Sequence, residues 1–162
     1  MPRRYRFTDP SYFHVLNRAV RRARMFEAAS DYLAFIQALS SAQTLVPTPI
    51  LAYCIMPNHF HLVIGPTLTP TLSAFMHRLT IMHSKRWHLS RGTTGTGAVY
   101  QGRFKALRIG DDAHFGAVCR YVEQNPIRAG LVERVEDWPW SSVSRDRRIC
   151  DLIALSPLPI LQ

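Results

Sequence analysis

The chain has 162 residues, 47% of them hydrophobic, which is enough for one well-packed core and short for two. Its 20 lysines and arginines outnumber its 11 acidic residues, and the formal net charge of +9 favours a polyanionic partner, either nucleic acid or an acidic membrane. Three cysteines without a C-x-x-C pair argue against a disulfide framework or a zinc knuckle, and no apolar run suits a membrane span or a signal peptide, so we expect a cytoplasmic protein.

The N-terminal half of the chain predicts three strands and one helix. Residues 12–20 mix aromatic and branched residues with polar ones in near alternation, as a half-buried strand does. Apolar residues at helical spacing over 30–43 predict an amphipathic helix. Residues 50–56 and 59–65 are two apolar runs, and the Pro-Asn pair between them predicts a tight turn that joins two strands.

A pair of histidines opens the second of these apolar runs. Side chains two residues apart leave a strand on the same face, so His59 and His61 can point at one ion while Phe60 enters the core. The pattern alone leaves open that both histidines are structural, either exposed or hydrogen-bonded within the protein.

The C-terminal half predicts a helix, a loop, a strand and another helix. Apolar residues at helical spacing, with a proline in the first turn, predict a helix over 70–90. Residues 91–97 are rich in glycine and threonine and predict a mobile loop. Residues 98–109 resume strand character and interleave Tyr100 with cations, a combination that suits single-stranded nucleic acid.

The last long helix should begin at Asp111 or Asp112 and end near Asn125, because a proline disfavours helical backbone in the residue before it. Tyr121 and Asn125 are four residues apart and lie together on the edge of its apolar face. A tyrosine in that place is most often a core residue whose hydroxyl reaches water, so the residues alone leave a catalytic role for Tyr121 open.

Three fragments of the chain, MPNHFHL, QGRF, and RYVEQNPIRAGLV followed by WPWSS, carry a family resemblance. In their order and spacing they resemble the REP-associated tyrosine transposases, single-tyrosine relatives of the HUH nucleases that act on repetitive extragenic palindromes (REP). The alternation of strands and helices predicts an α+β fold, an antiparallel sheet of four or five strands with two main helices, and the resemblance implies the ferredoxin-like architecture of HUH nucleases. We expect a single domain over 1–162, with a core of about 12–142 and a C-terminal tail over 143–162.

The resemblance also implies a chemistry for particular residues. Tyr121 matches the nucleophile, His59 and His61 match the paired metal ligands, and Asn125 falls where relatives place a third polar ligand of Mg²⁺ or Mn²⁺. The implied activity is that of a metal-dependent single-stranded DNA endonuclease and strand transferase, which cleaves hairpin-forming palindromes through a covalent 5′-phosphotyrosine. Plausible contacts to the DNA backbone are the basic residues Arg3, Arg4, Arg6, Arg103, Lys105 and Arg128.

Two alternatives accompany this interpretation. The chain could be a domesticated relative that holds hairpin DNA without cutting it, or a metal-dependent nuclease that uses water as its nucleophile. The sequence leaves open whether the protein is a monomer or a homodimer that exchanges its tyrosine helices. In either state we expect it in the cytoplasm, associated with the nucleoid.

Overall fold

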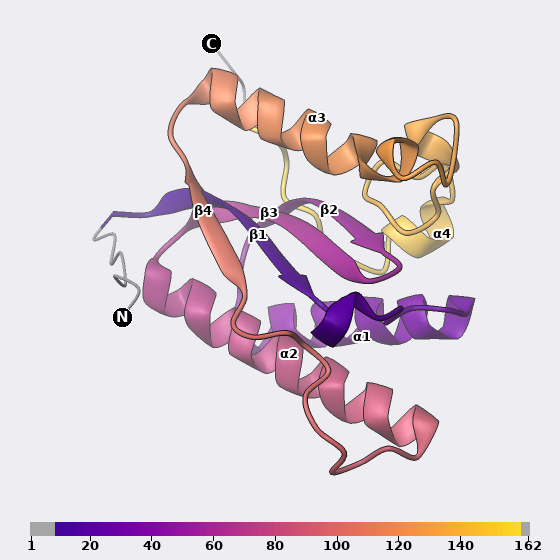
Figure 1. Ribbon diagram of the computed structural model, residues 1–162. Helices are drawn as coiled ribbons and strands as arrows, with labels where there is room; N and C mark the ends of the chain where they lie inside the picture. Colours follow the sequence, from indigo (N-terminus) through magenta and orange to yellow (C-terminus); the bar gives the residue numbers. More distant parts are fainter. Residues whose placement is uncertain (1–8, 160–162) are drawn as a thin grey trace.

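The computed structural model describes residues 9–159 and shows an antiparallel sheet between helices (Figure 1). The elements in chain order are β1 (Ser11–Arg18), the 3-10 turn η1 (Val20–Arg22), α1 (Ala29–Leu45), β2 (Ile50–Met56), β3 (His59–Thr67), α2 (Thr69–Arg91), β4 (Lys105–Ile109), α3 (Asp112–Arg128), the 3-10 turn η2 (Val135–Asp137) and α4 (Arg147–Cys150). The four strands lie in the order β2-β3-β1-β4, and neighbouring strands are antiparallel. The predicted α+β class with a four-stranded antiparallel sheet is therefore confirmed.

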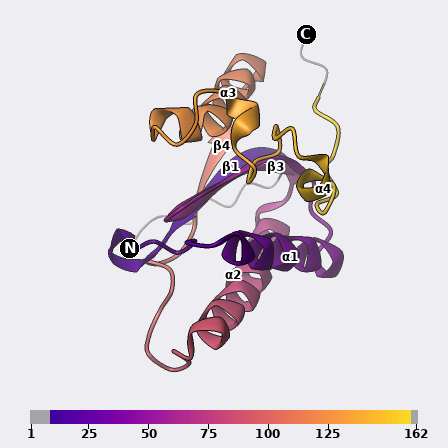
Figure 2. The ribbon, with the colours of Figure 1, turned by 90° about the vertical axis from the view of Figure 1, so that its right-hand side faces the viewer.

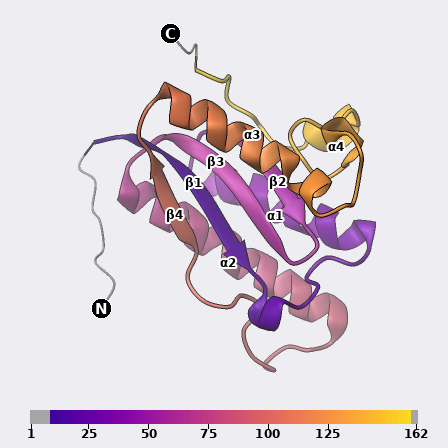
Figure 3. The ribbon, with the colours of Figure 1, turned by 45° about the horizontal axis from the view of Figure 1, so that its top comes forward.

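Three helices are long, α1, α2 and α3, and each lies on a segment for which the sequence predicted a helix, so the expected count of two main helices was too low. Figure 2 shows α1 and α2 below the sheet and α3 above it. Figure 3 shows α3 lying across the strands, on the face of the sheet opposite to α1 and α2. Within residues 9–159, none of the helices combines the length and apolarity that crossing a bilayer requires.

Successive side chains of β3 point to opposite faces of the sheet, as they do in any strand. Phe60, Leu62 and Ile64 enter the larger core beneath the sheet, which they share with α1 and α2. Val63 belongs to the smaller core under α3. The alternation therefore places His61, two residues before Val63, on the side of the sheet that α3 covers.

The predicted strand over 98–109 is wrong in its first half, because only Lys105–Ile109 pairs with β1. Tyr100 is 7% exposed, its ring meets that of Phe60 with 6.1 Å between centroids, and its hydroxyl lies 2.6 Å from Nδ1 of His83. This buried side chain anchors the segment before β4 to the larger core. Tyr100 is therefore a core residue and is not available for stacking on a base.

The predicted end of the last helix near Asn125 is also wrong, because α3 continues through Pro126 to Arg128. Proline lacks the N–H that would bond the carbonyl of Val122 four residues earlier. The side-chain Nδ2 of Asn125 lies 3.5 Å from that carbonyl and donates to the carbonyl of Tyr121 at 2.9 Å. The amide of Asn125 thus supplies a donor close to where the proline removes one, and the helix extends by one turn.

Gly65 occupies a position in β3 that excludes a side chain. Its φ is +134°, and a Cβ added there would lie 2.7 Å from the carbonyl oxygen of Ser11 and 2.8 Å from Cα of Tyr12. Gly65→Ala should therefore lower the free energy of unfolding by about 2 to 4 kcal/mol, measured by urea denaturation. Gly95→Ala is the matched control, since Gly95 has a φ of +85° and nothing within 4 Å, and it should cost about 1 to 2 kcal/mol. Equal losses in the two variants would contradict the steric argument.

Candidate active site

The two histidines of β3 face each other on the α3 side of the sheet. The ring centroids of His59 and His61 are 4.9 Å apart and their planes are nearly perpendicular, at 84°. His61 is buried, and His59 is half-buried at the start of the strand. As the H-x-H spacing predicted, both imidazoles therefore lie close together on one face of the sheet.

Tyr121 comes to these histidines from α3, which packs on β2 and β3. Its ring centroid lies 5.7 Å from that of His61, at an interplanar angle of 87°. The side chain is 41% exposed, and the guanidinium carbon of Arg128 lies 4.6 Å from the ring centroid on the next turns of the helix. A phenol that borders the histidines and is open to solvent can be reached by a large substrate.

Asn125 lies one turn beyond Tyr121 and reaches His59. Burial is the largest influence on the pKa of His59 and lowers it, and the side-chain amide of Asn125 acts in the opposite direction. Because Nδ2 of Asn125 donates to the carbonyl of Tyr121, its remaining polar atom is the amide oxygen. The structure therefore brings together the four residues that the family resemblance grouped, namely Tyr121, His59, His61 and Asn125.

Both imidazoles are held in the neutral form that a metal ligand needs. Burial, followed by the nearby charge of Arg18, lowers the pKa of His59 to about 4. Burial, followed by the charges of His59, His14 and Arg18, lowers the pKa of His61 to about 3. At neutral pH each ring consequently carries one hydrogen and one lone pair.

The hydrogen bonds of these rings direct a lone pair into the site. Oδ1 of Asn58 lies 2.6 Å from Nδ1 of His59, and since this oxygen can only accept, Nδ1 carries the hydrogen and Nε2 the lone pair. Nε2 of His61 is buried and has no hydrogen-bond partner among the described residues. An orphaned nitrogen of this kind in a native site calls for a missing partner, and a cation would provide one.

The donors fit a divalent cation of the Mg²⁺ or Mn²⁺ type. Within residues 9–159 no group of three or more His, Cys, Asp or Glu side chains is placed to hold a metal, so a closed zinc site of those ligands is not formed. The set found here is two imidazoles and one amide oxygen. Imidazole suits Mn²⁺, the amide oxygen suits either ion, and waters or phosphate oxygens would complete the shell.

Two residues beside the site were missed by the sequence analysis. His14 on β1 places Nε2 at 2.8 Å from Nδ1 of His61, and Arg18 on the same strand is paired with His59 across the sheet. The alternation of β1 puts both on one face, but only the strand register shows that this face adjoins the histidines of β3. No carboxylate of the described part of the chain forms a salt bridge with Arg18, so its charge is available to an anion.

The predicted DNA contacts do not all lie at this site. Arg3, Arg4 and Arg6 fall outside the described residues. Arg128 borders Tyr121, and Lys105 occupies the cross-strand row of Leu16 and His61, with its side chain on the same face. Arg103, in contrast, lines a different hollow of the surface.

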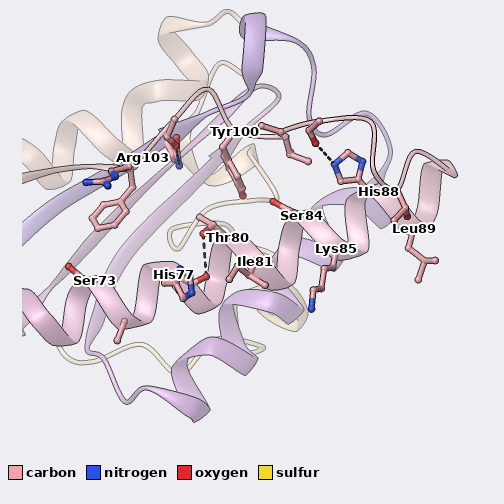
Figure 4. Close-up of a pocket in the computed structure, with 18 of the residues that line it drawn as sticks. Ser73, His77, Thr80, Ile81, Ser84, Lys85, His88, Leu89, Tyr100 and Arg103 are labelled. Carbon is pink, nitrogen blue, oxygen red and sulfur yellow. Dashed lines mark hydrogen bonds between the residues drawn. The ribbon is translucent and has the colours of Figure 1, made fainter.

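That hollow is a groove of about 1850 Å³ between α2 and the segment before β4 (Figure 4). Its wall from α2 includes Ile81, Lys85 and Leu89, and its other wall includes Tyr100 and Arg103. Because α2 covers the opposite face of the sheet from α3, the groove does not adjoin Tyr121. It is therefore separate from the histidines.

Comparisons with known proteins agree with the geometry. Residues 8–125 match the family described as "Transposase IS200 like". A REP-associated tyrosine transposase of Escherichia coli is 26% identical over 144 residues, which cover 89% of this chain and 82% of that protein. A candidate REP-associated tyrosine transposase of Haemophilus influenzae is 28% identical over 110 residues, which cover 62% of this chain and 61% of that protein, so the match spans less than two thirds of its length. A solved REP-associated tyrosine transposase bound to a REP hairpin superposes with a TM-score of 0.71 at 21% identity, covering 100% of this chain and 93% of the other, and shows the same fold.

Proposed function

The chain belongs to the IS200-like transposase family, and we propose that it is a metal-dependent endonuclease and strand transferase that cleaves hairpin-forming single-stranded DNA through a covalent bond to Tyr121. The observation that carries the proposal is the placement of the exposed phenol 5.7 Å, between ring centroids, from the buried His61, whose Nε2 lacks a partner. Membership of the family implies nuclease chemistry, and this placement supplies a nucleophile and a cation site for it.

The proposed reaction divides roles among few residues. His59, His61 and the amide oxygen of Asn125 would hold a divalent cation, which, when bound, polarises the scissile phosphate and neutralises charge on its oxygens. The phenolic oxygen of Tyr121 attacks phosphorus in line and loses its proton to solvent. The bond from phosphorus to the 3′ oxygen breaks, and that oxygen takes up a proton and leaves as a hydroxyl.

This exchange conserves the energy of the phosphodiester in the phosphotyrosine bond. The reverse attack, by a 3′ hydroxyl on the phosphotyrosine, therefore rejoins a strand without ATP and restores the phenol. The guanidinium of Arg128 over the ring of Tyr121 places a positive charge beside the phosphate that the phenol would attack. Arg18 beside His59 adds a second cation at the same place.

The proposed substrate is a DNA hairpin of the REP type. The E. coli relative bears the REP-associated name, and the solved neighbour holds a REP hairpin. The net charge of +9 supports binding to a polyanion. Such a substrate is found in the cytoplasm, on the nucleoid, where we propose that the protein acts. For the three arginines near the N-terminus and for Arg103, backbone contact stays a prediction.

Lys105 offers a test of the DNA-binding face. It is exposed on the α3 side of β4, so Lys105→Ala should weaken binding to a single-stranded hairpin about three- to tenfold and reduce the slope of log affinity against log salt by about 1. Fluorescence anisotropy at several salt concentrations measures both quantities. Arg147→Ala is the control, because Arg147 forms an exposed ion pair with Asp151 on α4, and it should keep the native slope. A Lys105→Ala variant with the native slope would refute the contact.

The proposed function as a whole is tested by a gel assay. A single-stranded REP-type hairpin with its natural flanks is incubated with the full chain and Mn²⁺, with and without EDTA, and resolved under denaturing conditions. We expect a protein–DNA adduct that depends on Mn²⁺. Binding without cleavage would favour the domesticated binder, and cleavage without an adduct would favour water as the nucleophile.

A further inference from the structure

A third imidazole, that of His14, borders the candidate active site and has no role in the proposed reaction. His14 leaves β1 on the α3 side of the sheet and is only 7% exposed. Its Nε2 lies 2.8 Å from Nδ1 of His61, and the two rings are stacked with 5.1 Å between centroids and 24° between planes. A buried contact of this length between two ring nitrogens requires one hydrogen between them.

The position of that hydrogen decides what His61 can do. If His14 carries it on Nε2, His61 must carry its own hydrogen on Nε2, where that N–H is buried and meets no acceptor. A buried donor without an acceptor is costly, and a protonated nitrogen cannot bind a cation. If His61 carries the hydrogen on Nδ1 and donates it to His14, Nε2 of His61 keeps its lone pair. Only this second arrangement is completed by a cation.

His14 also restrains the rings around it. Its ring centroid lies 5.9 Å from that of Tyr121, at 68°, so one imidazole contacts both the histidine and the phenol. His61 is thereby enclosed by His14, His59 and Tyr121. A ring held on these sides cannot turn over to exchange its two nitrogens without displacing a neighbour.

We propose that His14 is a positioning residue of the candidate active site, whose Nε2 accepts the hydrogen of His61 Nδ1 and so holds His61 in the tautomer that presents Nε2 to a divalent cation. The purpose of this arrangement rests on the proposed function. The arrangement itself is tested by the tautomer of His61 and by the affinity for a divalent cation, and both can be measured without DNA.

The first measurement locates the hydrogen. Long-range ¹H–¹⁵N spectra of the metal-free full chain at pH 7.5 distinguish the two tautomers of each histidine. We expect His61 to be protonated at Nδ1 in the native chain and in His14→Gln, whose amide oxygen replaces Nε2 of the imidazole as acceptor. In His14→Phe, which removes the acceptor, the preference should be lost. A native His61 protonated at Nε2 overturns the proposal, even if a variant fails to fold.

The second measurement is the affinity for Mn²⁺ alone, by isothermal titration calorimetry. His14→Phe should bind Mn²⁺ about 10- to 100-fold more weakly, as loss of an outer hydrogen bond to a ligand histidine does, and His14→Gln should stay within about threefold of the native chain. His114→Phe is the control, because His114 is an exposed histidine of α3 that bonds the backbone N–H of Gly110 instead of His61. If His14 served packing alone, Mn²⁺ affinity would be native in both His14→Phe and His14→Gln, and the two variants would not differ.

The outcomes separate this inference from the proposed function. A folded His14→Phe variant with native Mn²⁺ affinity overturns the inference, and so does a native chain that binds no Mn²⁺. A native chain with the expected tautomer and Mn²⁺ affinity, but without an adduct at Tyr121, upholds the inference and refutes the proposed function.

Discussion

A Tyr121→Phe variant should form no covalent adduct with hairpin DNA, a loss of at least about a thousandfold, while it binds the same DNA with native affinity. Phenylalanine lacks the nucleophilic oxygen and keeps the ring that contacts His61, His14 and Arg128. Because the ring contacts stay, the free energy of unfolding should change by less than about 0.5 kcal/mol. The adduct is measured with DNA labelled at its 3′ end, since the downstream fragment is the one attached through its 5′ phosphate.

Tyr12→Phe provides the matched control for this loss. Tyr12 lies on β1 under α3 and packs against Phe115, with 5.5 Å between ring centroids, so the variant removes one hydroxyl near the same helix but away from the histidines. It should form the adduct at the native rate. An adduct that persists in Tyr121→Phe would assign the nucleophile to another residue. Strand cleavage that persists without an adduct would assign it to water.

His61→Ala should lower the affinity for Mn²⁺ by at least about a hundredfold and remove the Mn²⁺-dependent adduct. The ring supplies a buried nitrogen that has no partner among the described residues, so its removal takes away one of the three proposed ligands. Calorimetry with Mn²⁺ alone measures the first effect, and the denaturing gel measures the second.

Truncation of a buried ring also costs stability, so thermal unfolding of His61→Ala must be recorded to show that the chain is folded at the assay temperature. His114→Ala removes an exposed imidazole on α3 and should bind Mn²⁺ as the native chain does. Native Mn²⁺ affinity in a folded His61→Ala variant would show that the cation is not held at this site.

The sequence was most informative where the structure is local. The shared face of His59 and His61 follows from the period of a strand, and the two apolar runs around the Pro-Asn turn became β2 and β3 with nearly the predicted bounds. The neighbourhood of Tyr121 and Asn125 follows from one turn of helix. These relations depend on residues a few positions apart, for which the backbone geometry is fixed by the element alone.

The parts that could not be predicted depend on contacts between distant residues. His14 and His61 meet because β1 lies beside β3 in one register, and nothing within the segment around His14 specifies that register. Tyr100 was expected beside the DNA. It is buried, because its hydroxyl contacts His83, a residue of α2 that lies 17 positions earlier in the chain. The extension of α3 past Pro126 is accompanied by side-chain contacts from Asn125 to the carbonyls of Tyr121 and Val122, which no helix propensity includes.

The short separation between the rings of Tyr121 and His61 within one chain has a consequence for stoichiometry. Under the proposed function, the nucleophile and the cation ligands come from one chain. Among the described residues Tyr121 is the phenol that borders His61, so a single molecule would retain one broken DNA end at a time. Excision of a segment with two boundaries would then require either two molecules acting together or one molecule that finishes with the first end before it opens the second.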